Sequence, residues 1–100
     1  MTLLWTWGGI FFGYEINDNL WTHTGRHVGR FYEDEIYNAK GKYLGELRNG
    51  NRLIVNRGRK SFIKPTYTPY MNRAPITPYS NYSGYAMYMG YEEFPGPREI

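Results

Sequence analysis

LWTHTGRHVGRF, residues 20–31, is the stretch that decides the fold, because it recurs along the chain. Sixteen residues earlier stands LWTWGGIFFGYE, residues 4–15, and sixteen residues later stands IYNAKGKYLGEL, residues 36–47. A looser copy, LIVNRGRKSFIK at residues 53–64, is displaced by seventeen, since one residue is added near Asn49-Gly50. Self-similarity at a fixed period indicates a repeat architecture, so the four copies are expected to fold alike.

Each copy predicts a β-hairpin with a glycine in its turn. The third copy has Asn38 at the first turn position and Gly41 at the fourth, which is typical of a type I turn closed by a G1 bulge. Thr6 and Thr22 hold the first position in the first two copies. Glycine is favoured because φ is positive there, a region that penalises any residue with a Cβ atom. The expected turn glycines are Gly9, Gly25, Gly41 and Gly58.

A second glycine follows an apolar residue in the first three copies and predicts a bend. Pairing across the turns puts both Val28 and Phe31 on the core face. Strict alternation would send them to opposite faces, whereas a β-bulge at Gly29 restores both to one core. The expected bend glycines are Gly13, Gly29 and Gly45. The fourth copy has a phenylalanine at this position, so its bend is expected to be shifted or absent.

Four hairpins that each bury one face need a closed arrangement, because no isolated hairpin is stable. The links between copies are tight, at residues 17–19, 33–34 and 49–50, and Asn-Gly is a strong signal for a reversal. We therefore predict an all-β fold of four repeated β-hairpins, with eight short strands in a closed, pseudo-four-fold antiparallel meander. The expected core residues are Leu4, Leu20, Ile36, Leu53, Val28, Leu44, Phe31 and Leu47.

The pattern shared by LWTHTGRHVGRF and IYNAKGKYLGEL is a strand, a polar turn with glycine, and then an apolar residue with glycine. This pattern resembles the four-fold beta-flower family of small bacterial proteins. The resemblance covers residues 4–64 and is carried by the repeat together with both glycines. It implies a pseudo-four-fold assembly of hairpins and no established activity. The first and fourth copies depart from the pattern, so perfect symmetry is not implied.

The composition changes after Lys64, which divides the chain into a repeat domain, residues 1–64, and an extended tail, residues 65–100. Four prolines in the first part of the tail exclude a regular helix or ladder. Tyrosines then recur at a spacing of three, the period of polyproline II, which would align them along one edge. They are Tyr79, Tyr82, Tyr85, Tyr88 and Tyr91. A tail this rich in aromatic residues is unlike a solvated disordered segment, so we expect it to dock on its own hairpins, on a neighbouring copy or on another protein.

One hundred residues make a single small domain whose core is marginal without help, and oligomerisation is one form of help. The chain has no cysteine, so no disulfide stabilises it. Its start, MTLLWTWGGIFFGYE, lacks the basic residue and the small-residue cleavage site of a secretory signal. No apolar run approaches the ~20 residues that cross a bilayer. A cytoplasmic protein without a membrane partner is the expectation.

The net charge of +3 is unevenly placed. Six cations and no acid lie between residues 48 and 64. They are Arg48, Arg52, Arg57, Arg59, Lys60 and Lys64. This basic end would suit phosphates or an anionic surface. The plainer interpretation is a solvated face whose charges keep an edge strand from pairing.

The sequence predicts no enzyme and no cofactor. Glu33, Asp34 and Glu35 lie at a tight link where acids are ordinary solvated turn residues, and neither a Ser-His-Asp grouping nor a phosphate-binding loop is suggested. His23 and His27 flank one turn and are able to approach each other, but a metal needs a third and usually a fourth ligand. We interpret them as turn-flanking histidines and predict no metal site.

These features favour a non-enzymatic protein-interaction or assembly module whose partner is a protein, either another copy in a homo-oligomer or a different chain. Nucleic-acid or anionic-ligand binding through the six cations is the alternative, since bases stack on aromatic rings while Lys and Arg meet phosphates. Carbohydrate binding by exposed Trp and Tyr rings is the third. Trp7 has no aromatic counterpart in later copies, so it is the ring freest for a ligand or for the tail.

Overall fold

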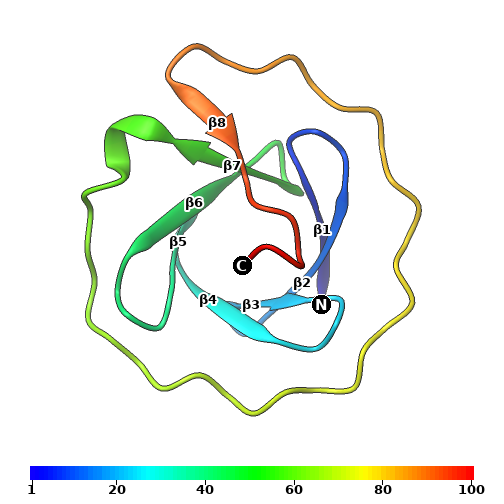
Figure 1. Ribbon diagram of the computed structural model, residues 1–100, viewed down its shortest axis with the longest axis vertical. Coiled ribbons are helices and arrows are strands. Elements are labelled where there is room, and N and C mark those ends of the chain that lie inside the picture. Colours follow the sequence, from blue (N-terminus) through cyan, green and yellow to red (C-terminus); the bar gives the residue numbers. More distant parts are fainter.

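Seven short strands follow one another around a closed barrel, and an eighth strand from the end of the chain adds to the last of them (Figure 1). The computed structural model describes all 100 residues. The strands are β1 (Thr2–Thr6), β2 (Phe11–Ile16), β3 (Asn19–Thr22), β4 (His27–Tyr32), β5 (Glu35–Tyr37), β6 (Tyr43–Arg48), β7 (Arg52–Asn56) and β8 (Tyr91–Glu93). One 3-10 turn, η1 (Arg57–Arg59), is the only helical element, which confirms the predicted all-β class. No helix has the length and hydropathy needed to span a membrane.

The first three copies form hairpins 1, 2 and 3, made of β1–β2, β3–β4 and β5–β6. In each, the amide of the turn glycine donates to the carbonyl three residues earlier at 2.9–3.0 Å. The value of φ is +95° at Gly9, +97° at Gly25 and +81° at Gly41. Asn38 Oδ1 also accepts two amides of its own turn, at 2.9 and 3.0 Å. These are the type I turns with a G1 bulge that the sequence predicts.

A register shift beside the second glycine bends each of these hairpins. In hairpin 2, Leu20 pairs with Gly29, but the next pair skips one residue of β4. The skipped residue is Val28, which is 8% exposed and belongs to the core. Hairpins 1 and 3 have the same shift at Gly13 and Gly45. The bulge therefore lies where the predicted bend glycines stand and lets neighbouring apolar residues share one core.

The barrel closes between its first and last strands through a parallel β1–β7 pairing, in which Trp5 pairs with Arg52. A meander with an odd number of strands brings its two ends together in the same direction, so closure at seven strands has to be parallel. The predicted closure is confirmed, but the prediction of eight successive antiparallel strands is corrected in this detail.

The fourth copy supplies one strand instead of two. Gly58 lies in η1 and lacks the positive φ of the other turn glycines, so its predicted turn role is wrong. Residues 60–64 form no strand and keep only a bridge between Ile63 and Lys42. β8 takes the place of the missing partner and pairs antiparallel with β7. The cause is local, because this copy has no bend glycine to direct a second strand back along the first.

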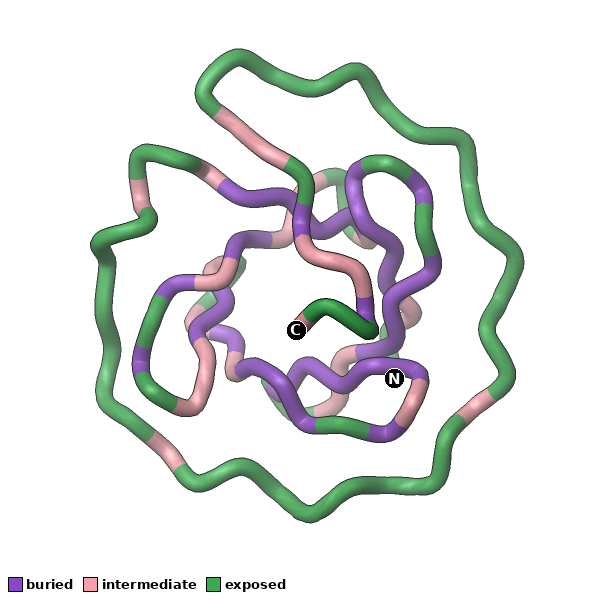
Figure 2. Tube along the Cα trace, in the orientation of Figure 1, coloured by how far each residue is buried: buried purple, intermediate pink, exposed green.

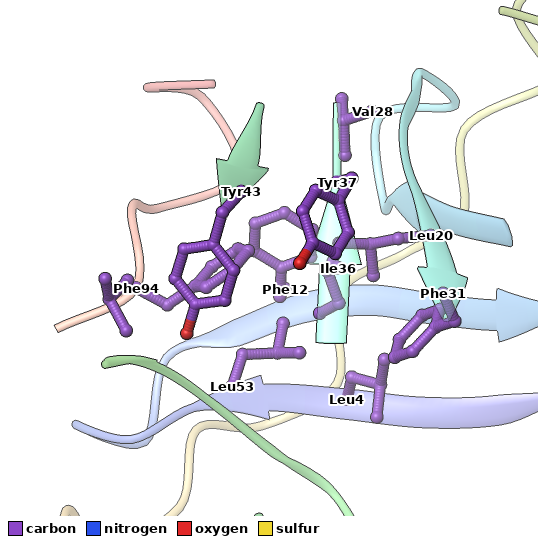
Figure 3. Packing of buried hydrophobic residues seen from close by; sticks show 11 residues of the cluster. Leu4, Phe12, Leu20, Val28, Phe31, Ile36, Tyr37, Tyr43, Leu53 and Phe94 are labelled. Atoms are coloured by element: carbon purple, nitrogen blue, oxygen red, sulfur yellow. The ribbon is translucent and has the colours of Figure 1, made fainter. Parts of the chain in front are cut away.

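The leading apolar residues of the four copies meet in the middle of the barrel (Figure 3). They are Leu4, Leu20, Ile36 and Leu53, each 0% exposed. Val28 and Phe31 belong to the same cluster, as predicted. Leu44 and Leu47 are only half-buried at its edge, which corrects the predicted core. Leu47 lines an open hollow of about 140 Å³, so part of its side chain stays in contact with solvent.

Phe94 completes the core from the far end of the chain. It is 1% exposed and meets Phe12 edge to face, with ring centroids 5.3 Å apart. In Figure 3 it lies beside Tyr43, on the side of the cluster away from Leu4 and Phe31. Residues 94–100, the cap, then run to the middle of the barrel in the view of Figure 1. This role differs from the predicted one, in which Phe94 belongs to the tail and not to the core.

Candidate interaction surface: a belt around the hairpin tips

Residues 64–90, the belt, circle the barrel along the rim of a disc of 36 × 32 × 21 Å (Figure 1). The belt has no helix or strand, and it passes the tips of hairpins 3, 2 and 1 in that order before it joins β8. Its residues are almost all exposed, as the green outer loop in Figure 2 shows. The tail thus lies on its own hairpins, which is one of the three docking modes that the sequence left open.

The belt meets the barrel at regular intervals, with each contact nine residues further along the belt and sixteen residues earlier in the barrel than the one before it. At each tip, a belt amide donates to the carbonyl of the turn glycine at 2.7–2.9 Å. These pairs are Lys64–Gly41, Arg73–Gly25 and Tyr82–Gly9. Three residues later, a second belt amide donates to the carbonyl two residues before that glycine at 2.9–3.1 Å. These pairs are Tyr67–Ala39, Ile76–His23 and Tyr85–Trp7. Main-chain hydrogen bonds therefore hold the belt at three equivalent stations.

Every third side chain of the belt turns inward to the track, which is the hairpin-tip surface of residues 5–11, 21–27 and 37–43. The series is Lys64, Tyr67, Tyr70, Arg73, Ile76, Tyr79, Tyr82, Tyr85 and Tyr88, and Tyr91 of β8 continues it. Tyr67 and Ile76 are the only belt residues that are partly buried, and both belong to this series. The period of three noted for five tyrosines thus extends over the whole belt, in keeping with a polyproline-like chain.

The turn glycines serve the belt as well as the turn. A Cβ atom on Gly9 would lie 2.0 Å from the carbonyl oxygen of Tyr82, and one on Gly41 would lie 2.1 Å from that of Lys64. No side chain fits at such a distance, so the belt reaches the tips only because these residues are glycines. The turn pattern predicts the first role of these glycines, whereas nothing in it indicates the second.

The tryptophans of hairpin 1 receive the end of the belt. Tyr82 stacks on Trp5 with ring centroids 3.9 Å apart. Trp7 is 1% exposed, packs against Tyr85 and donates through Nε1 to the Ala86 carbonyl at 3.0 Å. Trp7 therefore receives the tail, which is one of the two roles considered for it. All three tryptophans are at most 5% exposed, so none offers an open face to a carbohydrate.

Arg52, assigned to the basic end, lies beneath the belt and is 5% exposed. It donates to the carbonyls of Trp7 at 3.1 Å and Ser83 at 3.0 Å. Its guanidinium carbon lies 4.3 Å from the ring centroid of Tyr85. A buried cation needs such partners, and these carbonyls and this ring supply them. Arg52 therefore ties the belt to hairpin 1, which corrects its expected role in anion binding.

Three further cations of the basic end pair with acids from other parts of the chain. Arg59 binds the carboxylates of Glu35 at 2.8 Å and Glu46 at 3.3 Å. Lys60 pairs with Glu92 at 2.5 Å, and Arg57 approaches the same carboxylate at 4.0 Å. These contacts fasten η1 to hairpin 3 and to β8.

Arg48 and Lys64 lie against aromatic rings. Arg48 donates to the Tyr91 hydroxyl at 2.8 Å. The Lys64 ammonium lies 5.2 Å from the ring centroid of Tyr32. The structure therefore distributes the six cations among an ion-pair network, the belt and β8, and brings only three of them, Arg48, Arg59 and Lys64, to one open groove.

An open groove of about 740 Å³ lies beside the Arg59 network. Its charged lining has both signs, with Glu33, Asp34, Glu35, Glu46, Arg48, Arg59 and Lys64. Tyr37 donates to Glu35 and Tyr43 donates to Glu46, each at 2.7 Å. Burial, reinforced by the bonded carboxylate, raises the pKa of Tyr37 to about 12, and burial raises the pKa of Tyr43 as well. The carboxylates of Glu35 and Glu46 are thus already bound by Arg and Tyr partners.

The two histidines have different surroundings. His27 uses both ring nitrogens, Nε2 at 3.0 Å from the Gly29 carbonyl and Nδ1 at 3.0 Å from the Tyr70 amide. The ring of His23 packs at 6.0 Å from that of Phe11. Burial is the main cause that lowers the pKa of both histidines. No group of three side chains able to hold a metal gathers in the chain.

No protein-family model matches the chain, and no curated protein or solved structure matches it. The resemblance to the four-fold beta-flower family rests on the repeat and its glycines. The function has to be inferred from the belt and its contacts.

The belt contains a second repeat, which the sequence analysis missed. Divided into nines from Lys64, it reads KPTYTPYMN, RAPITPYSN and YSGYAMYMG. The first two segments share Thr-Pro-Tyr-x-Asn, and the Asn81 side chain of the second accepts the Phe11 amide at 2.9 Å. Aligning these segments would have predicted three equivalent stations.

Proposed function

We propose that the protein is a non-enzymatic interaction and assembly module whose track holds an extended Tyr/Pro-rich segment. The observation that carries the proposal is the register of the belt, in which one pair of main-chain hydrogen bonds recurs at three stations nine residues apart. Main-chain bonds supply affinity that tolerates sequence change, while sites for alternate side chains supply selectivity. The track contacts every third side chain of the bound segment, so these are the side chains that it selects.

The resident segment is the chain's own belt, and the partner we propose is the belt of a second copy. The path of the belt continues into β8, which pairs with β7, and then into Phe94, which fills the core. A ligand that occupies the track, the edge of β7 and the core position of Phe94 needs inward side chains at every third residue, then a strand, then an aromatic residue. A second copy has all of these, and exchanging an identical element between protomers requires no new contacts.

The link between barrel and belt suits such an exchange. Residues 60–63 are exposed, with Phe62 at 45% and Ile63 at 77%. The inward tyrosines from Tyr70 to Tyr88 keep 45–58% of their surface exposed on the track. Detaching the belt would uncover Trp5, Trp7 and Trp21, which are at most 5% exposed beneath it, so exchange is favoured only where the belt of a second copy covers them again.

A cut belt tests the proposal. A protease site inserted after Met71, which is 90% exposed, gives pieces 1–71 and 72–100 after native cleavage. We expect the pieces to stay together on size exclusion, and a labelled peptide 72–100 to exchange into the complex. The matched control is the same peptide with alanine at Arg73, Ile76, Tyr79, Tyr82 and Tyr85.

Two results would count against the proposal. One is separation of the pieces while the circular dichroism of the barrel is unchanged. The other is equal exchange of the alanine peptide, which would mean that the track does not select its ligand.

The two rival functions, anion or nucleic-acid binding and carbohydrate binding, find few unpaired cations and few exposed tryptophan rings on this chain. The cations proposed for anion binding face carbonyls, acids and rings of the same chain, and the tryptophans are covered. A nucleic-acid module would bind single-stranded DNA at low salt, with an affinity that falls steeply as salt rises. Such binding by the uncut protein would favour the rival over our proposal.

A further inference from the structure

His27 connects the barrel to the belt through a side chain that titrates. It is 8% exposed, and its Nδ1 lies 3.0 Å from the amide nitrogen of Tyr70. Because the amide is a donor, Nδ1 has to be the acceptor, and the ring proton is on Nε2, which faces the Gly29 carbonyl at 3.0 Å. Only the neutral imidazole in this one tautomer satisfies both contacts.

The Tyr70 amide bond is the single hydrogen bond that ties residues 68–72 to the barrel. The stations on either side are held by main-chain carbonyls at Ala39 and Gly25, which do not titrate in this pH range. Loss of the His27 bond would therefore free one stretch of the belt and leave its neighbours attached.

The surroundings of the imidazole oppose a positive charge. The rings of Trp21, Tyr67 and Tyr70 lie 5.1–5.3 Å from it and shield it from water, which disfavours the charged form although an aromatic face by itself attracts a cation. The charged groups that face this cluster are Arg30, over the Tyr67 ring, and Arg73, over the Trp21 ring. Burial and the Arg30 charge lower the pKa of His27, although its bond to the Gly29 carbonyl acts the other way.

We propose that His27 is a proton-operated latch that releases residues 68–72 of the belt when the solution is acidified. Protonation at Nδ1 sets an N–H group against the Tyr70 amide N–H, so the acceptor of the latch disappears. The freed stretch uncovers the Trp21 face of the track, where another segment gains access. This regulatory role rests on the proposed function, whereas the release itself does not.

Hydrogen exchange of the full-length protein tests the latch. After correction for intrinsic exchange, we expect exchange of the Tyr70 amide to stay constant from pH 7.5 to about 6.5, the ordinary pKa of histidine, and then to rise as the pH falls to 5, by up to about tenfold per pH unit, because opening takes up one proton only in that range. The amides of Lys64 and Tyr82, whose acceptors are glycine carbonyls, should show no such rise.

Two variants sharpen the test. In His27→Asn the side-chain oxygen stands the same number of bonds from Cα as Nδ1, so it is placed to accept from the Tyr70 amide but takes up no proton, and the pH response should vanish. His23→Asn is the matched control, since His23 stands in the same turn and its ring has no hydrogen bond to the belt, and its response should equal that of the natural protein. An unchanged response in His27→Asn would overturn the latch.

A direct reading of the ring does not depend on any variant. Long-range nitrogen shifts of His27 in the natural protein should report the Nε2-protonated tautomer at pH 7.5 and a charged ring once Tyr70 exchanges fast. A charged ring at pH 7.5, or Tyr70 protection that is the same at both pH values, would also overturn the latch. Failure of the proposed function looks different, because peptide 72–100 would then fail to exchange into the cut protein at every pH.

Discussion

The main chain of Arg73 holds Gly25 through two close approaches, with its amide donating to the Gly25 carbonyl at 2.7 Å and its own carbonyl oxygen 1.9 Å from where a Cβ atom would stand. Two separate constraints therefore require glycine at this position. One is the positive φ of the turn, and the other is the presence of the belt.

Alanine substitution separates the two constraints. Gly50 also has a positive φ, +78°, but nothing lies within 4 Å of its Cβ position. Gly50→Ala should cost about 1–2 kcal/mol, the usual penalty of the left-handed region. Gly25→Ala should cost about 1–3 kcal/mol more, because the belt has to move. Urea denaturation of both variants measures the difference, and equal losses would show that the belt does not press on the tip.

Arg52 should be the cation on which folding depends. Arg52→Met removes the donor of the buried Trp7 carbonyl and a second bond to the Ser83 carbonyl, and we expect a loss of about 2–4 kcal/mol. Arg57→Met is the matched control, since the Arg57 side chain is 66% exposed and its ion pair is long, so it should change stability by less than about 0.5 kcal/mol. Thermal unfolding of the two variants checks this. Similar melting temperatures for the two variants would mean that the contacts of Arg52 with the carbonyls and the Tyr85 ring do not stabilise the fold.

Phe94 should matter to the barrel although it lies after the belt. Phe94→Ala leaves a cavity against Phe12 and above Gly45, and we expect a loss of about 3–5 kcal/mol. Phe62→Ala is the control, because Phe62 is 45% exposed, and it should cost less than about 1 kcal/mol. Denaturant unfolding followed by tryptophan fluorescence compares the two variants. A small loss of stability for Phe94→Ala would show that the cap does not contribute to the core.

The protein should lose stability in alkali over a defined range. The folded state raises the pKa of Tyr37 and of Tyr67 to about 12, mainly through burial, whereas an unfolded tyrosine titrates near 10. Above pH 10 the unfolded state therefore binds fewer protons than the folded state, so the free energy of unfolding falls as pH rises from 10 to 12. Urea unfolding at a series of pH values measures the fall. A flat profile would contradict the burial of these hydroxyls.

Removing one of these hydroxyls tests the same prediction by urea unfolding over the same series of pH values. Tyr37→Phe removes one late-titrating hydroxyl together with its bond to Glu35. The variant should therefore show a smaller loss of stability between pH 10 and 12 than the natural protein. Tyr79→Phe, whose ring is 52% exposed, is the control that should follow the natural profile.

Local pattern was enough to predict three of the four hairpins and their closed arrangement. The spacing of Gly25 and Gly29 within one copy defines a turn and a bulge, and both depend on backbone conformations that few other residues adopt. Repetition of that spacing then places Leu20 and its equivalents in a common core. No information from distant parts of the chain is needed for these steps.

The individual contacts of the belt, of β8 and of the basic end could not be predicted, because the residues that make them lie far apart along the chain. Arg59 and Lys60 appeared as part of a basic face because their partners, Glu46 and Glu92, lie outside the basic run. The pairing of β8 with β7 joins residues that are nearly forty positions apart, and no local pattern marks it. Two patterns carried a signal: the tyrosine period of three, which predicted a docking tail, and the nine-residue repeat, which becomes meaningful when set against the sixteen-residue repeat of the barrel.

The belt visits the three hairpins in the reverse of their order along the chain, and this couples the lengths of two distant regions. A fourth complete hairpin would need a sixteen-residue insertion in the barrel and a nine-residue insertion in the belt, at separate places in the gene. Either insertion alone would leave a tip uncovered or a loop of belt with nothing beneath it. Growth by simple tandem duplication is therefore blocked, and the number of hairpins is fixed by the segment that encircles them.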